Sequence, residues 1–364
     1  MSLTCGIIGL PNVGKSTIFN ALTSSSIPAE NYPFCTIEPH MGIVPLPDSR
    51  LNILEKIYEP EKVTPANVEF TDIAGLVKGA SKGEGLGNQF LGQIRQVDAI
   101  IHVVRCFEDE NISHVEESID PIRDIELIET ELLLADLDTI EKTLTRLDKI
   151  SRSDKNMIDD YELVKNLKIF CDEGNPARDF SCNSSELNII KSMFLLTSKP
   201  IMYIANINEE ELLSDSPGDF SKLLLTQFGE QADVIKLCGK VEQEISTLDK
   251  NEQKEFLEEY KLHEPGLNIL IRNAFNLLDL ETYFTGGKTE VRAWTIKKGS
   301  SAPKAASAIH TDFEKGFIKA EIIKYKDLEK LGSEKLVKES GLSKLEGKDY
   351  IVQDGDCIFF HFNV

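Results

Sequence analysis

The stretch Gly9-Leu10-Pro11-Asn12-Val13-Gly14-Lys15-Ser16 reads G-x-x-x-x-G-K-S and directly follows a short apolar run, Thr4 to Ile8. Glycines at this spacing let consecutive backbone N–H groups curl around a phosphate, while Lys15 reaches the β- and γ-phosphates and the Ser16 hydroxyl ligates Mg²⁺. The next segment, Thr17 to Leu22, is helix-prone, and the dipole at its N-terminus adds to anion binding. Strand, loop and helix together predict a nucleotide-binding phosphate loop.

Length and composition are those of an ordinary globular chain. The 364 residues suffice for two or three domains, and 41% hydrophobic with 28% charged residues is typical of such proteins. The seven cysteines are scattered and form no C-x-x-C pair or zinc-type cluster, so we expect reduced thiols in a cytoplasmic protein. The first residues lack the charged and apolar regions of a signal peptide. The longest apolar stretch, Ala99 to Val104, is too short to span a bilayer, so we expect no membrane partner.

The charge is strongly negative and unevenly placed. A net charge of −21 argues against a protein that coats nucleic acid by neutralising phosphates. Residues 281–364 nevertheless carry 14 Lys and Arg against 13 Asp and Glu, a net +1, so the preceding 280 residues carry 26 against 48, a net −22. The lysine-rich C-terminal segment could therefore contact RNA where the rest of the chain could not. The alternative is a solvated surface of mixed charge.

Six β-like runs recur at the spacing of a nucleotide-binding α/β domain. Helix-prone segments between them predict a mostly parallel, doubly wound sheet of the P-loop NTPase type. The six runs are Thr4 to Leu10, Gly42 to Leu46, Asn67 to Asp72, Ala99 to Cys106, Pro200 to Asn206 and Val234 to Cys238.

The fourth and fifth of these runs are far apart, and the segment between them has a helical pattern. Apolar residues recur at spacings of 4, 3, 4 and 3 from Leu133 to Leu147, which is an apolar seam on a charged helix. A second helical stretch around Leu163 to Phe170 can fold back on it, which predicts an antiparallel coiled-coil hairpin inserted over residues 119–198. We expect the seam to pack within the chain, with a partner-binding seam as the alternative.

The C-terminal part of the chain reads as a separate small α+β domain. Val291 to Ile296 alternates like a strand, and Ala320 to Ile323 is strand-like. Asp354-Gly355 is a turn signal between two β-rich runs. The predicted domains are therefore residues 1–118 with 199–280, which form a discontinuous GTPase-type domain, the insert 119–198, and residues 281–364.

Two elements beyond the phosphate loop indicate a nucleotide switch. Asp72-Ile73-Ala74-Gly75 is a D-x-x-G at the end of the third run, where the Asp72 carboxylate can hold Mg²⁺ through water and the glycine N–H can meet a γ-phosphate. Thr36 lies between the first helix and the second strand, where a switch threonine ligates Mg²⁺ in the triphosphate state. The predicted metal ligands are therefore Ser16, Thr36 and Asp72, in the GTPase-like branch of P-loop proteins.

The base-reading element departs from the GTP-specific pattern. GTP-specific relatives carry N-K-x-D after the fifth strand, whereas this chain has Asn206-Ile207-Asn208-Glu209. The longer Glu209 side chain cannot form the same short fork, and Asn206 offers the donor and acceptor that would bond an adenine N6/N7 edge. Adenine is therefore a candidate base. The second base-loop element, usually Ser-Ala-Lys, is Cys238-Gly239-Lys240, which is either a partly retained base loop or a plain strand-ending loop.

The residue that orients the hydrolytic water in Ras-like enzymes is replaced. Leu76 follows the D-x-x-G where a glutamine is expected, and an apolar side chain cannot position water, so we expect slow intrinsic hydrolysis. His114, beyond the fourth strand, is a candidate for this role, and the alternative is an ordinary surface histidine. Asn12 is a second polar candidate. In several relatives with an apolar residue after D-x-x-G, this asparagine helps to hold a K⁺ in place of an arginine finger.

Five motifs resemble the Obg-like ATPase (YchF) family of TRAFAC-class P-loop NTPases, and the resemblance covers essentially the whole chain. The motifs are Gly9 to Ser16, Asn31 to Pro39, Asp72 to Ala80, Asn206 to Glu209 and Gly347 to Asp356. The resemblance implies a GTPase-type domain with an inserted antiparallel coiled coil, followed by a β-grasp domain of the TGS type. It also implies ATP preferred over GTP through Asn206 and Glu209, a catalytic histidine at His114, and a role connected with the ribosome and stress responses.

The leading hypothesis is a Mg²⁺-dependent ATPase that acts as a nucleotide switch, with His114 and Lys15 as its catalytic residues and the ribosome as its partner. We expect a monomer that meets RNA only through the ribosome or the TGS domain, and K⁺ is a candidate second cation. The alternatives are a GTP-specific switch, a ribosome- or RNA-binding module with incidental turnover, and a kinase acting on a small molecule. The predicted nucleotide-binding residues are Asn12, Val13, Gly14, Lys15, Ser16, Thr17, Asn206, Ile207, Glu209, Cys238 and Gly239.

Overall fold

A computed structural model describes residues 3–24, 40–73, 86–109, 118–154, 157–214, 216–229 and 232–363. Their packing divides the chain into two compact units. The first unit combines Met1–Gly42 with Glu69–Leu270, and the second combines Ile43–Val68 with Ile271–Val364. The division into three domains that we made from the sequence stays a prediction.

Among the described residues, the first of two sheets contains six strands, and they occur where the sequence predicts them. Their order in space is β2-β4-β1-β5-β6-β7. β1 pairs in parallel with β4 on one side and with β5 on the other, and the pairs β5–β6 and β6–β7 are also parallel. All residues of β5 and β6 are buried, as in parallel strands that are covered on both faces. The strands are β1 (Thr4–Ile8), β2 (Met41–Pro45), β4 (Asn67–Asp72), β5 (Ala99–Arg105), β6 (Ile201–Asn206) and β7 (Val234–Leu237).

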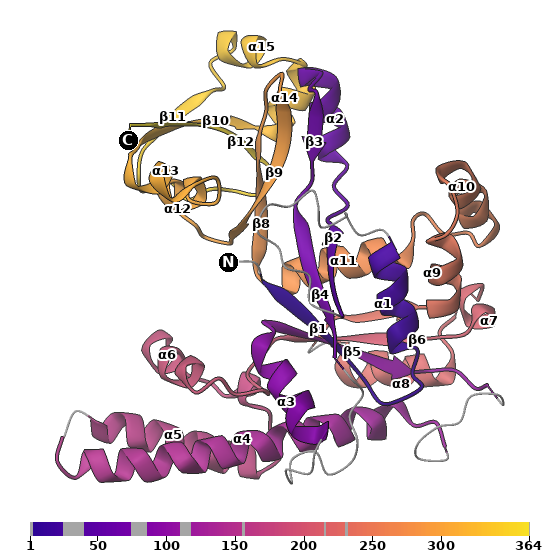
Figure 1. Ribbon diagram of the computed structural model, residues 1–364, viewed down its shortest axis with the longest axis vertical. Helices are drawn as coiled ribbons and strands as arrows, with labels where there is room; N and C mark the ends of the chain where they lie inside the picture. Colours follow the sequence, from indigo (N-terminus) through magenta and orange to yellow (C-terminus); the bar gives the residue numbers. More distant parts are fainter. Residues whose placement is uncertain are drawn as a thin grey trace. The chain divides into compact units, whose positions relative to one another are not determined.

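Helices lie on both sides of this sheet, which is the doubly wound arrangement (Figure 1). In that view α1 and α9 lie above β5 and β6, and α3 and α8 lie below. Because β1 is central, the loop that follows it opens at the middle of the sheet, where α/β folds bind nucleotides. The helices are α1 (Lys15–Ser24), α3 (Leu86–Gln96), α7 (Glu209–Leu212), α8 (Asp219–Phe228), α9 (Gly239–Ile245), α10 (Lys250–Glu259) and α11 (Gly266–Leu277).

A helical hairpin separates β5 from β6 in the chain, as predicted. Its helices are α4 (Pro121–Ser151) and α5 (Ile158–Asp172), followed by the 3-10 turn Ala177–Asp179 and α6 (Ser184–Ser192). The apolar seam of α4 packs inside the hairpin, since Ile140 and Leu147 are buried in one cluster with Val164 and Leu167 of α5. Leu133, Leu137 and Leu144 pack against the same cluster. The seam is therefore intramolecular, as we expected.

Side chains fix both ends of this insert. Asp120 caps α4 by accepting a hydrogen bond from the Arg123 N–H at 3.1 Å. Asp136, which is 1% exposed, accepts from the Leu196 N–H, the Thr197 N–H and the Thr197 hydroxyl, each at 2.7 Å. The middle of α4 is thereby tied to the segment that leads into β6.

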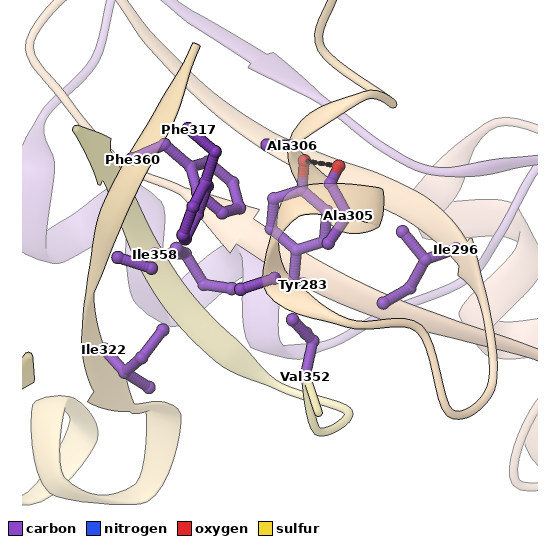
Figure 2. Packing of buried hydrophobic residues seen from close by; sticks show 11 residues of the cluster. Tyr283, Ile296, Ala305, Ala306, Phe317, Ile322, Val352, Ile358 and Phe360 are labelled. Atoms are coloured by element: carbon purple, nitrogen blue, oxygen red, sulfur yellow. Dashed lines mark hydrogen bonds between the residues drawn. The ribbon is translucent and has the colours of Figure 1, made fainter. Parts of the chain in front are cut away.

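The second sheet has the order β11-β10-β12-β8-β9-β3. Its apolar core lies between the sheet and the short helices α12 and α13, and Figure 2 shows the Tyr283 ring at the centre of this cluster. The Tyr283 hydroxyl donates to the Ala305 carbonyl at 3.0 Å, so the buried oxygen is paired. The elements are β3 (Lys62–Thr64), β8 (Leu280–Thr285), β9 (Glu290–Lys297), α12 (Ala302–Ala306), α13 (Thr311–Lys315), β10 (Phe317–Lys324), α14 (Tyr325–Leu331), α15 (Glu334–Glu339), β11 (Lys344–Glu346) and β12 (Asp356–Phe362).

An early segment of the chain completes the second unit. β3 pairs in parallel with β9, with Lys62 opposite Glu290 and Thr64 opposite Arg292. Helix α2 (Arg50–Tyr58) joins the same unit, where the Tyr58 hydroxyl donates to a Glu334 carboxylate oxygen at 2.6 Å. Residues 43–68 thus contribute the strand β3 to the second sheet and the helix α2 to the same unit.

The Asp354-Gly355 turn does not join two strands of a hairpin, contrary to the expectation. β12 begins directly after the turn, but before it only Ile351 forms a bridge, with Ser301, among the residues that the structure describes. The buried Asp356 carboxylate accepts from the Tyr350 hydroxyl at 2.7 Å and from the Gln353 N–H at 2.9 Å. These bonds tie residues 350–353 to the start of β12 as a loop, and no ladder of strand hydrogen bonds forms between the described residues on the two sides of the turn.

Candidate functional site

The phosphate loop runs from the end of β1 to the start of α1. Its backbone enters the left-handed region at Asn12, with φ of 64°, and at Gly14, with φ of 90°. A side chain at Gly14 would also collide with the Asn206 amide. Glycine is therefore required at position 14 for two separate reasons, conformation and space. The loop ends at Lys15, the first residue of α1, so the helix N-terminus faces the predicted phosphate position.

Three of the predicted phosphate and metal groups meet at the end of this loop. The Lys15 ammonium contacts one oxygen of the Asp72 carboxylate, and the Ser16 hydroxyl lies 3.5 Å from the other. The sheet brings Asp72 there because its register pairs Asp72 of β4 with Ile7 of β1. Lys15 and Asp72 are largely buried, with 10% and 13% of their side chains exposed. A hydroxyl and a carboxylate are hard oxygen donors, so this donor set fits Mg²⁺.

Asn206 is buried at the end of β6 and holds two loops together. Its amide nitrogen donates to the Val13 carbonyl at 2.8 Å, and its amide oxygen accepts from the Gly239 N–H at 3.0 Å. The predicted bidentate bond to adenine needs both the donor and the acceptor of this amide. The two bonds use one of the two amide hydrogens and one of the two oxygen lone pairs, so Asn206 positions the phosphate loop against the loop after β7, and its base-reading role stays a prediction.

Ile207 and Cys238, two of the predicted nucleotide-binding residues, are buried directly after the ends of β6 and β7. Ile207 is 2% exposed, and its N–H donates to the Leu237 carbonyl at 2.9 Å. Cys238 is 3% exposed, and burial raises the pKa of its thiol, so the group stays neutral. Gly239 opens α9 and packs against Ile18 of α1. The Cys238-Gly239 segment is thus tied to the phosphate loop through Asn206.

Glu209, the acidic residue of the predicted base-reading motif, lies at the surface, with 43% of its side chain exposed. The Tyr260 hydroxyl donates to its Oε1, and the Lys240 ammonium lies 3.9 Å from its Oε2. This hydrogen bond and burial raise the pKa of Tyr260 to about 12. Tyr260 was missed from the sequence because it lies 51 positions away, beyond α10, and belongs to no recognisable motif.

The remaining predicted site residues cannot be placed. Thr36, His114 and the Gly75-Leu76 pair lie outside the described residues, so their roles stay predictions. Asn12 is exposed in the phosphate loop, and Thr17 follows Ser16 in the first turn of α1.

Known proteins match this fold and this chain over its full length. The chain is 52% identical to the ribosome-binding ATPase YchF of Bacillus subtilis strain 168 and 50% identical to that of Escherichia coli O157:H7, each over 100% of both chains. The chain belongs to the YchF family. The solved structure of the Schizosaccharomyces pombe YchF GTPase superposes with a TM-score of 0.90 and 37% identity, and covers 99% of this chain and 98% of that one.

Two sequence-family models match separate parts of the chain. One describes a 50S ribosome-binding GTPase and matches residues 4–137, and the other, named for the C-terminal domain of YchF GTPases and described as a protein of unknown function, matches residues 280–363. The predicted family and the P-loop fold class with its C-terminal domain are thereby confirmed. Among the described residues, no helix combines the length and the apolar character needed to cross a membrane.

Proposed function

We propose that this chain is a Mg²⁺-dependent nucleotide-switch ATPase that prefers ATP to GTP and associates with the ribosome. Family membership and the P-loop fold make it a nucleotide hydrolase. The observation that carries the proposal is the meeting of Lys15, Ser16 and Asp72 at the loop between β1 and α1. The bacterial relatives are called ribosome-binding ATPases, which supports both the base and the partner.

The phosphates would be held by Lys15 and by the N–H groups of the loop and the first turn of α1. Ser16, Asp72 and Thr36 would hold Mg²⁺, which neutralises charge on the phosphate oxygens when bound. Lys15 must exchange its contact with Asp72 for the β- and γ-phosphates, and the Asp72 carboxylate is then released for the metal side of the site. Phosphate and metal binding are therefore expected to reinforce each other.

The base preference is the point on which the names of the relatives differ, because the fission yeast structure is described as a GTPase. Isothermal titration of the full chain with ATP and with GTP, both with Mg²⁺, decides it. We expect ATP to bind at least about tenfold more tightly, a difference of about 1.4 kcal/mol. Tighter binding of GTP would reject the ATP preference and favour the GTP-specific switch.

Hydrolysis is assigned to His114, with Lys15 stabilising the charge on the phosphates. Replacing His114 with alanine should lower turnover about 10²- to 10⁴-fold, the usual contribution of a positioned acid–base group, and leave ATP affinity unchanged. Equal turnover in the variant would remove His114 from the mechanism. A role for K⁺ at Asn12 is tested by comparing turnover in KCl and NaCl, where equal rates would exclude it.

The ribosome is proposed as the partner that reads the nucleotide state, which places the protein in the cytoplasm, as a monomer. Co-sedimentation of the full chain with ribosomes should differ between ATP and ADP. A Lys15→Ala variant should lose this difference, because the loop no longer holds the phosphates. Association that is strong but identical in both nucleotides would instead favour a ribosome-binding module with incidental turnover, supported by the charge-separated residues 281–364.

A further inference from the structure

The Glu209 carboxylate is engaged by a partner outside the known base-loop motifs. It stands at the first position of α7, a short helix whose N-cap, Asn208, accepts from the Glu211 N–H at 2.9 Å. The Tyr260 hydroxyl donates to Oε1 of this carboxylate. The backbone of α7 and a side chain from the end of α10 therefore fix the direction of Glu209.

The position of Tyr260 is itself well supported. Its ring stacks on Phe256, one turn earlier in α10, with centroids 4.6 Å apart and an interplanar angle of 16°. This stacking holds the ring in place and so positions the hydroxyl that donates to Glu209. On the other side of the carboxylate, Lys240 from α9 lies 3.9 Å from Oε2. The two oxygens consequently face different neighbours.

The two purine bases make different demands on such a carboxylate. Guanine presents its N1–H and N2–H₂ donors side by side, and an acidic side chain satisfies both by turning its two oxygens toward the same edge. Adenine has one amino group, N6–H₂, as a donor on its edge, which a single oxygen can accept. The Tyr260 hydroxyl takes one lone pair of Oε1 and restricts the direction in which the carboxylate can turn, so setting both oxygens against guanine is harder than presenting one oxygen to adenine.

We propose that Tyr260 is a specificity-determining residue that disfavours guanine by fixing the orientation of the Glu209 carboxylate through Oε1. The inference rests on the proposed function, because it takes Glu209 to lie at the base edge. Tyr260 acts through Glu209 and does not need to touch the nucleotide. The raised pKa of Tyr260, about 12, keeps its hydroxyl protonated and donating at neutral pH.

The test uses Tyr260→Phe in the full chain, since this change removes the hydroxyl and retains the ring that stacks on Phe256. We expect GTP affinity to rise about five- to tenfold and ATP affinity to change less than about twofold, so that the ATP-to-GTP selectivity falls. Binding of tripolyphosphate, which has no base, should not change. Tyr325→Phe is the matched control, because Tyr325 donates to Glu329 at 2.9 Å in the second unit, and its selectivity should equal that of the wild type.

A second variant, Glu209→Gln, distinguishes a failure of the role proposed for Tyr260 from a failure of the proposed ATP preference. No ATP preference in the wild type would overturn the proposed base preference itself. An ATP preference that Glu209→Gln reduces but Tyr260→Phe leaves intact would overturn the role of Tyr260 alone. Parallel losses of affinity for ATP, GTP and tripolyphosphate in Tyr260→Phe would also overturn it, since they indicate a structural defect.

Discussion

At the scale of single residues, Asn206 links the phosphate loop to the loop after β7 through one side-chain amide. Asn206→Ala leaves the Val13 carbonyl and the Gly239 N–H without this partner, and each buried unpaired group costs about 1–3 kcal/mol. We expect affinity for ATP and for GTP to fall together, by about tenfold or more, in titration calorimetry. A loss confined to ATP would instead favour the base-reading role that the sequence predicted.

A matched asparagine controls for lost stability in that experiment. Asn183 caps α6 by accepting from the Ser185 and Glu186 N–H groups, so Asn183→Ala should cost about 1 kcal/mol of unfolding free energy. Its nucleotide affinity should stay at the wild-type value. Equal affinity losses in both variants would contradict a specific role for Asn206.

His102, in the middle of β5, makes stability depend on pH. The side chain is 1% exposed, its Nδ1 has no hydrogen-bond partner in the part of the chain that the structure describes, and its ring lies 5.7 Å from that of Tyr203. Burial, with a smaller contribution from the Arg178 charge, lowers the pKa of His102 from 6.5 to about 3. The folded protein therefore keeps this imidazole neutral in a range where the unfolded chain protonates it.

The sign of the effect follows from this difference. Below pH 6.5 the unfolded state binds one more proton at His102 than the folded state, so the free energy of unfolding falls by about 1.4 kcal/mol per pH unit from this group. Urea unfolding between pH 6.5 and 4.5 should show a shallower loss for His102→Phe than for the wild type. The exposed His263, changed to phenylalanine, should keep the wild-type slope. Identical slopes for His102→Phe and the wild type would contradict the assignment.

At the scale of elements, two aspartates that lie two residues apart on α4 have unequal roles. Asp136 is buried and accepts three hydrogen bonds from the segment before β6, whereas Asp138 is 65% exposed and pairs with Lys142. Asp136→Ala leaves three donors unpaired and should lower the free energy of unfolding by about 3 kcal/mol or more. Asp138→Ala should cost less than about 0.5 kcal/mol. Urea denaturation followed by circular dichroism compares them, and similar midpoints would refute the anchoring role of Asp136.

Elements with local signals were predictable from the sequence, and those chosen by distant partners were not. β5 and β6 are continuous apolar runs, and α4 carries an apolar seam, so their burial can be predicted from the local sequence. The strands, the hairpin and the phosphate loop therefore follow from the sequence. The pairing of β3 with β9 has no comparable local signal, because three residues of strand say nothing about a partner more than 220 positions away. The contact of Tyr260 with Glu209 was unpredictable for the same reason.

At the scale of the whole molecule, the second unit depends on two segments far apart in sequence, and Arg50 joins them. Its guanidinium binds Asp48 within the early segment at 2.7 Å, and binds Asp354 at 2.7 Å and the Thr282 hydroxyl at 3.1 Å in the late one. A lysine cannot reproduce this fork, since its ammonium is a single point charge. Arg50→Lys should therefore loosen the early segment from the late one.

The expected loss is about 1–3 kcal/mol of unfolding free energy for the second unit, the usual range for hydrogen bonds to charged groups. The only tryptophan of the chain, Trp294, lies in β9 of this unit, so its fluorescence in urea reports on this unit directly. Lys62→Gln is the control from the same early segment, because Lys62 is 66% exposed, lies 4.0 Å from Glu290, and should contribute less than about 1 kcal/mol. An Arg50→Lys midpoint that matches the control would show that β3 pairing and α2 packing hold the segment without the guanidinium.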